Sequence, residues 1–201
     1  MKPEILYATT NPGKLGEVKK YLGSEITVVS PRERGLDIEV DETADTLEEN
    51  ALLKARAFHQ ASPSDLVMGD DTGLEIDALG GEPGVHVRRW KDGQTRLSDE
   101  EIIEYCLERL KGVPPGQRGA QFRTVIALVT PEGEEHTFDG ILRGEMVTEP
   151  LDLRIEGFPF RGLFYVTEAN CYLGELEDKP DTNVLTHRQR AVRNTVDWLK
   201  E

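Results

Sequence analysis

The first part of the chain alternates short apolar runs with segments whose apolar residues recur every three or four positions. Residues 4–10 (EILYATT) and 26–30 (ITVVS) are apolar runs of strand length. Between them, residues 13–22 (GKLGEVKKYL) place their apolar side chains on one face of a helix. The pattern therefore predicts a strand, a helix and a second strand.

Three further segments have the periodicity of a helix: residues 46–60, 98–111 and 186–200. Thr46 and Glu49 have the spacing of a capping box, in which two side chains satisfy the first backbone N–H groups of a helix. Ser98 and Glu101 repeat this spacing, and Thr186 is a suitable cap for the last helix. These signals predict where each of the three helices begins.

The remaining apolar runs predict strands. Residues 65–71 (DLVMGDD) form a short run that we expect to end at Asp70 and Asp71. Residues 120–130 and 134–147, joined by the turn sequence PEG, predict a long antiparallel pair. Strands that alternate with helices early and pair as a hairpin later indicate an α/β protein with a mixed sheet.

The composition favours one globular domain over residues 1–201, since this length supports a single core. No apolar run approaches the roughly 18 residues of a membrane span. The N-terminal sequence is too polar for a signal peptide, and we expect a cytoplasmic protein. The cysteines Cys106 and Cys171 lack metal-ligand spacing, which agrees with a reducing compartment.

The net charge of −14 weighs against binding to nucleic acid or to an anionic membrane, because both need a positive surface. An anionic ligand would need a local cluster of cations or a metal ion.

The sequence TTNPGK (9–14) places Lys14 in the first turn of the first predicted helix. Unpaired backbone N–H groups at a helix N-terminus and a nearby lysine can bind an anion. The spacing differs from the Walker pattern, so this is not a P-loop. The alternative is a plain connection between strand and helix with an exposed lysine.

The adjacent Asp70 and Asp71 are the most informative acidic pair. Side chains alternate between the two faces of a strand, so the two carboxylates should point in different directions. A second group of acids, in EVDETADT (39–46), comprises Glu39, Asp41, Glu42 and Asp45. One carboxylate from each segment, together with substrate phosphates, would suit Mg²⁺. The alternative for the second group is a solvated loop whose acids favour the following helix dipole.

His187 and Arg188, in THRQRA (186–191), open the last predicted helix. Cations there oppose the helix dipole, which costs a few tenths of a kcal/mol. An anion or an acceptor-rich base could offset this cost, whereas a surface position would need no partner.

Taken in order, the segments ATTNPGK, ENALLKA, DDTGLEIDALGGEPGV and THRQRA resemble the inosine/xanthosine triphosphate pyrophosphatases. The resemblance extends from Ile5 to the final helix. It implies Mg²⁺-dependent attack of water between the α and β phosphates of deaminated purine nucleoside triphosphates. It also implies a homodimer, and two lobes with the active site in the cleft between them.

The resemblance implies roles for individual residues. Asp71 matches the family's catalytic aspartate, which binds the metal and activates water, while Asp70 completes the acidic metal site and Glu42 is a further metal ligand. The substrate-binding residues would be Thr9, Thr10, Asn11, Lys14, Lys54, Thr72, Arg89, Phe158, Phe160, Arg161, His187 and Arg188.

The sequence departs from the family in its base-recognition loop, GFPFRGLF (157–164). Phe158 and Phe160 keep the aromatic surfaces that stack on a purine. Arg161, however, stands where the family has an aspartate, and a guanidinium donates where a carboxylate accepts. We hypothesise that Arg161 contacts an acceptor on an unusual base, or a phosphate.

Two further departures concern cations. The family has a lysine five residues before the His-Arg pair, where this chain has Thr182, with Lys179 nearby but out of register. Arg88, beside the matching Arg89, adds a positive charge. These changes favour retained chemistry with altered recognition.

Deaminated purine triphosphates are therefore the leading substrates, and another or a modified nucleoside triphosphate is the second possibility. A nucleotide-binding protein without hydrolysis is a third, and a purely structural α/β protein a fourth.

Overall fold

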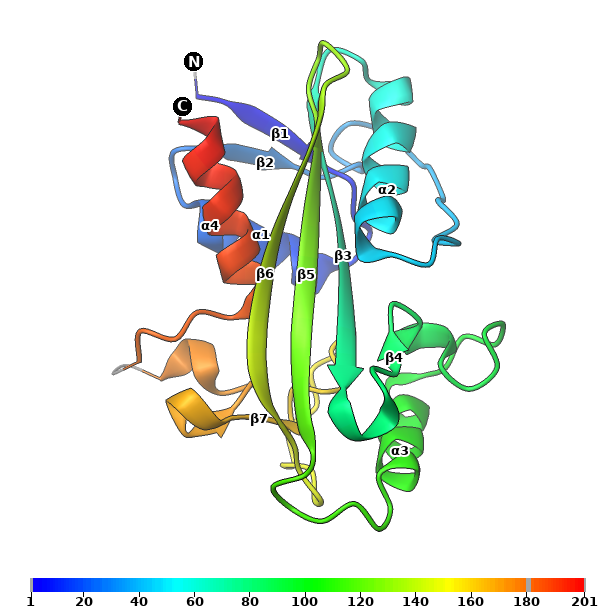
Figure 1. Cartoon of the computed structure of the whole chain (residues 1–201). Helices are drawn as coiled ribbons and strands as arrows, with labels where there is room; N and C mark the ends of the chain where they lie inside the picture. Colours follow the sequence, from blue (N-terminus) through cyan, green and yellow to red (C-terminus); the bar gives the residue numbers. More distant parts are fainter. Residues whose placement is uncertain (1, 180–181, 201) are drawn as a thin grey trace. The chain divides into compact units, whose positions relative to one another are not determined.

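The computed structural model describes residues 2–179 and 182–200 (Figure 1). Its α-helices are α1 (Pro12–Leu22), α2 (Leu47–Ala61), α3 (Asp99–Arg109) and α4 (His187–Leu199). Its strands are β1 (Glu4–Tyr7), β2 (Thr27–Val29), β3 (Leu66–Ile76), β4 (Pro83–Gly84), β5 (Gly119–Val129), β6 (Glu135–Met146), β7 (Phe164–Val166) and β8 (Cys171–Tyr172). None of the helices described is long and apolar enough to cross a membrane.

Backbone pairing in the described residues joins the strands in the order β2-β1-β3-β5-β6-β7-β8, and β4 pairs with β3. Strand β1 runs parallel to both neighbours, with Ile5 opposite Val28 of β2 and Leu66 of β3. Strands β4, β7 and β8 pair antiparallel. The expected α/β fold with a mixed sheet is confirmed.

Contacts divide the described chain into two compact units. Unit 1 comprises residues up to Thr72, Thr124–Gly140 and the chain from His187 onward, and unit 2 comprises Gly73–Arg123 and Ile141–Thr186. The long strands β3, β5 and β6 contribute residues to both units.

In unit 1, helices lie on both faces of the sheet. Helices α1 and α4 pack together over one face, where Tyr7 of β1, Met68 of β3 and Ile126 of β5 meet Val18 and Val192 in a core. Helix α2 lies against the other face, close to Gly69 of β3. A side chain on β3 therefore faces either the α1–α4 pair or α2.

Unit 2 has a core between α3 and its own segments of the sheet. Ile102 and Cys106 of α3 pack with Phe122, Phe160 and Phe164. Ser98 and Glu101 form the complete capping box that the sequence predicts.

The C-terminal end of α3 is held by Arg118. This buried guanidinium donates to the carbonyl oxygens of Leu110 at 2.9 Å, Val113 at 2.9 Å and Val147 at 3.2 Å. A cation at the C-terminus of a helix also interacts favourably with the helix dipole.

The prediction that β3 ends at the paired aspartates is wrong. The strand continues through residues 72–76, where Leu74 and Glu75 pair with β4, and β3 pairs with the long strand β5 as well. Asp70 and Asp71 consequently lie in the middle of a buried strand, not at its end. The sequence pattern also did not predict the short strands β7 and β8.

Candidate functional site

The alternation of β3 places the two adjacent carboxylates on opposite faces of the sheet in unit 1, as expected. The side chain of Asp70 meets residues of β1, α1 and α4, whereas the side chain of Asp71 meets residues of α2. Both side chains are buried. Each carboxylate therefore needs its own partners, since an unpaired buried charge is costly.

Asp70 lies among three donors. The Tyr7 hydroxyl donates to Asp70 Oδ1 at 2.6 Å, and Lys14 Nζ lies 3.0 Å from Asp70 Oδ2. The Arg188 guanidinium approaches the same oxygen at 3.5 Å. Burial alone would raise the pKa of Asp70, but Lys14, Arg188 and Lys54 outweigh it and hold the pKa well below its usual range. Asp70 is therefore a fixed negative charge.

Asp71 is held by α2. Asn50 Nδ2 donates to Asp71 Oδ2 at 3.2 Å, and Lys54 Nζ lies 3.7 Å from Asp71 Oδ1. The same ammonium lies 3.2 Å from Oε2 of the exposed Glu42. Asn50 and Lys54 share a helix face because they are four residues apart.

The two carboxylates differ in pKa. Burial raises the pKa of Asp71 to about 6, because it outweighs the attraction of Lys54 and Lys14, and because Glu42 and Asp70 also disfavour a further negative charge. Burial lowers the pKa of Lys54, but Asp71, Asp70 and Glu42 raise it overall. Asp71 is thus the carboxylate whose ionised form gains most from an added cation.

The donor chemistry fits a divalent cation that also binds a ligand. Among the described residues, no group of three or more His, Cys, Asp or Glu side chains is arranged to hold a metal ion. However, an ammonium already lies between Glu42 and Asp71. Mg²⁺ needs only one or two carboxylates when phosphates supply further oxygens. Glu42 and Asp71 are therefore the residues that fit Mg²⁺, while Asp70 lies on the other face.

The His187 and Arg188 side chains that open α4 have partners within unit 1. Arg188 donates to Glu17 Oε2 at 2.6 Å and to Thr72 Oγ1 at 3.1 Å. The Thr72 hydroxyl shares a 2.8 Å hydrogen bond with Thr124, whose hydroxyl is 2.6 Å from His187 Nδ1. The contacts of Arg188, together with Asp70, explain how this buried cation is tolerated at a helix N-terminus.

The TTNPGK connection was expected to offer unpaired backbone N–H groups to an anion, but two of these groups already have a partner. Asn11 caps α1, and its side-chain oxygen accepts from the backbone N–H groups of Gly13 at 2.9 Å and Lys14 at 3.2 Å. Thr9 Oγ1 in turn accepts from the backbone of Asn11, and Thr10 is exposed. The Lys14 ammonium, one-fifth exposed, is thus the cation that this connection offers.

Four predicted substrate-binding residues lie in unit 2. Phe160 is only 3% exposed and packs in the core beside Phe122, so its ring does not offer a surface for stacking in this structure. Phe158 is partly exposed, and the Arg161 guanidinium lies 4.5 Å from its ring centre. Arg89 is partly exposed in the 3-10 turn η2 (Val87–Arg89).

Lys179 does not stand in for the missing family lysine. Its ammonium donates to the carbonyl oxygens of Ala169 at 2.5 Å and Asn170 at 3.0 Å, and it therefore fixes a turn of unit 2. Thr182 accepts a hydrogen bond from the backbone N–H of Val184.

Tyr7, Glu17, Asn50 and Thr124 contact the predicted site residues but were not among them. All of them except Thr124 offered a weak signal. Tyr7 brings a hydroxyl into an apolar strand, and Asn50 lies four residues before Lys54 on an apolar helix face. Glu17 follows Lys14 by three residues, again on one helix face.

The fold and the site define an α/β protein whose buried carboxylates and cations suit an anionic, metal-associated ligand. The chain belongs to the Ham1 family, whose model matches residues 5–198.

Sequence and structure comparisons agree. The dITP/XTP pyrophosphatase of Symbiobacterium thermophilum is 38% identical over 199 residues, which cover 97% of this chain and 94% of that protein. The dITP/XTP pyrophosphatase of Bacillus subtilis is 38% identical over 192 residues, covering 94% and 93%. The structure of the Staphylococcus aureus Ham1 protein has a TM-score of 0.80 at 32% identity, and covers 98% of both chains.

Proposed function

We propose that this chain hydrolyses the deaminated purine nucleoside triphosphates dITP, ITP and XTP to the monophosphate and pyrophosphate. The observation that carries the proposal is the division of labour between two adjacent carboxylates. Asp70 is charge-neutralised by Lys14 and Arg188, whereas Asp71 is raised in pKa and lies beside Lys54 and Glu42. Relatives with the name dITP/XTP pyrophosphatase support the substrate class.

The residues of unit 1 divide the work as phosphoryl chemistry requires. Asp71 and Glu42 would hold Mg²⁺, which would neutralise phosphate charge and make a bound water a better nucleophile. Asp71 accepts the proton of the attacking water when its carboxylate is ionised. Lys54 and Lys14, whose charges interact although their nearest carboxylates face opposite ways, bind the polyphosphate, and Asn50 orients Asp71.

The enzyme acts as a homodimer in the cytoplasm, where it removes deaminated nucleotides from the pool. Light scattering on the purified protein tests the dimer, and a monomer at working concentrations would contradict it.

The experiment is pyrophosphate release with Mg²⁺, measured for ITP, dITP, XTP and the standard triphosphates. Asp71→Asn should lower the rate by about 100-fold or more, as expected on loss of a general base. Asp197→Asn is the matched control, because Asp197 is an exposed carboxylate of α4. Nucleotide binding without turnover in the wild type would instead support a binding protein.

A second candidate substrate, another or a modified nucleoside triphosphate, is favoured by one observation. Arg161 lies over the ring of Phe158, where an acceptor group on a base or a phosphate could reach the guanidinium. Arg161→Asp should then shift preference toward ITP and XTP. Unchanged selectivity would reject a role for Arg161 in recognition.

A further inference from the structure

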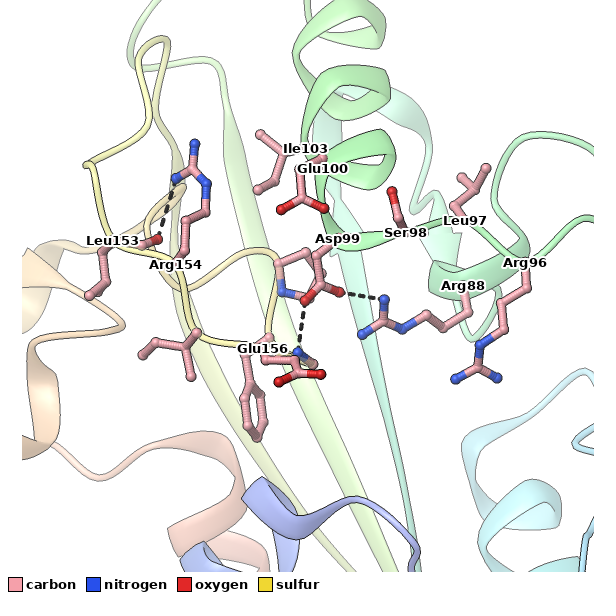
Figure 2. Close-up of a pocket in the computed structure, with 14 residues that line it drawn as sticks. Arg88, Arg96, Leu97, Ser98, Asp99, Glu100, Ile103, Leu153, Arg154 and Glu156 are labelled. Atoms are coloured by element: carbon pink, nitrogen blue, oxygen red, sulfur yellow. Dashed lines mark hydrogen bonds and ion pairs between the residues drawn. The ribbon is translucent and has the colours of Figure 1, made fainter.

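Unit 2 contains a cavity of about 560 Å³ whose two walls come from separate segments. One wall consists of Arg88, of residues 96–100 around the start of α3 and of Ile103, and the other consists of residues 153–159. Figure 2 shows Asp99 pointing from α3 toward both Arg88 and the segment next to Glu156.

Asp99 links the two walls directly. Its Oδ1 accepts from Arg88 NH1 at 2.5 Å, and its Oδ2 accepts from the backbone N–H of Gly157 at 2.7 Å. The carboxylate is about one-fifth exposed, so solvent competes weakly for these bonds. Gly157 has φ of +81° within a turn closed by a bond from the Phe158 N–H to the Ile155 carbonyl. The loop 157–164 is therefore anchored at its first residue.

Asp99 is not needed to start its own helix. Ser98 and Glu101 form the capping box of α3, and both bonds of that box are present without Asp99. The Asp99 carboxylate is consequently committed to Arg88 and Gly157. Removal of this carboxylate should loosen the loop while α3 keeps its cap.

We infer that Asp99 is a positioning residue that sets substrate selectivity by fixing Gly157, and with it Phe158, relative to Arg88. This inference rests on the proposed function. It takes the loop 157–164 as the part of the chain that recognises the base of the nucleotide. Asp99 acts through Gly157 and Arg88 and does not itself contact the reacting phosphates.

The test compares Asp99→Ala with Glu100→Ala, which removes the neighbouring acid from the same helix turn and the same cavity wall. Hydrogen exchange at the Gly157 amide should accelerate about 10-fold in Asp99→Ala, as expected for loss of a charged acceptor. The KM for dITP should rise about 10-fold with kcat within about twofold, and the preference over dGTP should fall. Glu100→Ala should change none of these.

A second pair keeps the test decisive if Asp99→Ala folds poorly. Arg88→Gln should leave Gly157 exchange near the wild-type rate, because the Asp99–Gly157 bond persists, and should raise KM for dITP at least about threefold. Arg96→Gln, which removes another arginine of the cavity wall, should leave both unchanged.

Unchanged Gly157 exchange in Asp99→Ala would overturn the inference, as would faster exchange with unaltered KM and selectivity. If the wild type hydrolysed no nucleotide, the proposed function would fail together with the selectivity role. The exchange measurement would still show separately whether Asp99 anchors Gly157.

Discussion

The Tyr7 hydroxyl donates a 2.6 Å hydrogen bond to the Asp70 carboxylate, and both residues are fully buried. The bond joins β1 to β3 across the face that α1 and α4 cover. It orients Asp70 so that its second oxygen meets Lys14 and Arg188.

Tyr7→Phe should lower the free energy of unfolding by about 1.5–3 kcal/mol, because a buried carboxylate loses a donor. Urea unfolding at pH 7 measures the change. Tyr172→Phe removes a hydroxyl from a partly exposed tyrosine of β8, and should stay within about 0.5 kcal/mol of the wild type. Equal effects of the two variants would show that the Tyr7 hydroxyl contributes nothing specific.

The adjacent aspartates should give stability opposite dependences on pH. The pKa of Asp70 is lower in the folded protein than the ordinary value, although its burial acts in the other direction. Its contribution is therefore complete above pH ~4 and is lost as pH falls through the folded pKa. The stability difference between wild type and Asp70→Asn should shrink as the pH falls below about 4.

Asp71 has the reverse sign, because burial raises its pKa to about 6. Between its unfolded and folded pKa values the native state holds more protons, so stability falls as pH rises toward 6. The stability difference between wild type and Asp71→Asn should decrease over this interval and level off above it. Urea unfolding at intervals of half a pH unit tests both signs, and parallel curves for the two variants would contradict them.

A comparison of substitutions at Glu42 and Glu39 distinguishes a metal ligand from an acidic residue of the same loop that binds no metal. Glu42→Gln should raise the Mg²⁺ concentration for half-maximal activity by at least about 10-fold, a loss typical even of residues that only support a ligand. Glu39 is exposed in the same loop, and Glu39→Gln should have no effect. Activity that survives complete chelation of divalent cations would refute the metal assignment.

Two glycines should respond to alanine in opposite directions. A Cβ at Gly69 would lie 2.3 Å from the Ala51 carbonyl oxygen of α2, whereas a Cβ at Gly16 of α1 has nothing within 4 Å. Gly69→Ala should cost about 1–3 kcal/mol by overpacking, and should shift Asn50 and Lys54 away from Asp71. Gly16→Ala should stabilise by about 0.5–1 kcal/mol, since alanine favours a helix interior. Thermal unfolding and activity of both variants decide this.

Local signals predicted the helices well. The caps at Thr46 and Ser98 begin α2 and α3 where expected, because capping depends on residues three positions apart. Strand alternation likewise predicted that Asp70 and Asp71 face opposite ways.

Contacts between distant segments could not be predicted in this way. The extension of β3 beyond Asp71 pairs with β4, which has only two residues and no recognisable strand pattern. Similarly, the roles of Tyr7 and Thr124 arise from neighbours across the sheet. The sequence suggested that Phe160 offers an exposed ring in its loop, but this ring is packed in the core of unit 2.

The first turn of α4 packs directly against the backbone of β6 at Gly140. A Cβ at Gly140 of β6 would lie 2.2 Å from the His187 carbonyl oxygen and 2.5 Å from the Ala191 amide nitrogen. The distance between the first turn of α4 and β6 is therefore set by direct contact between their backbones. One methyl group at Gly140 would therefore displace His187 and Arg188 together, because both open the turn that lies on it.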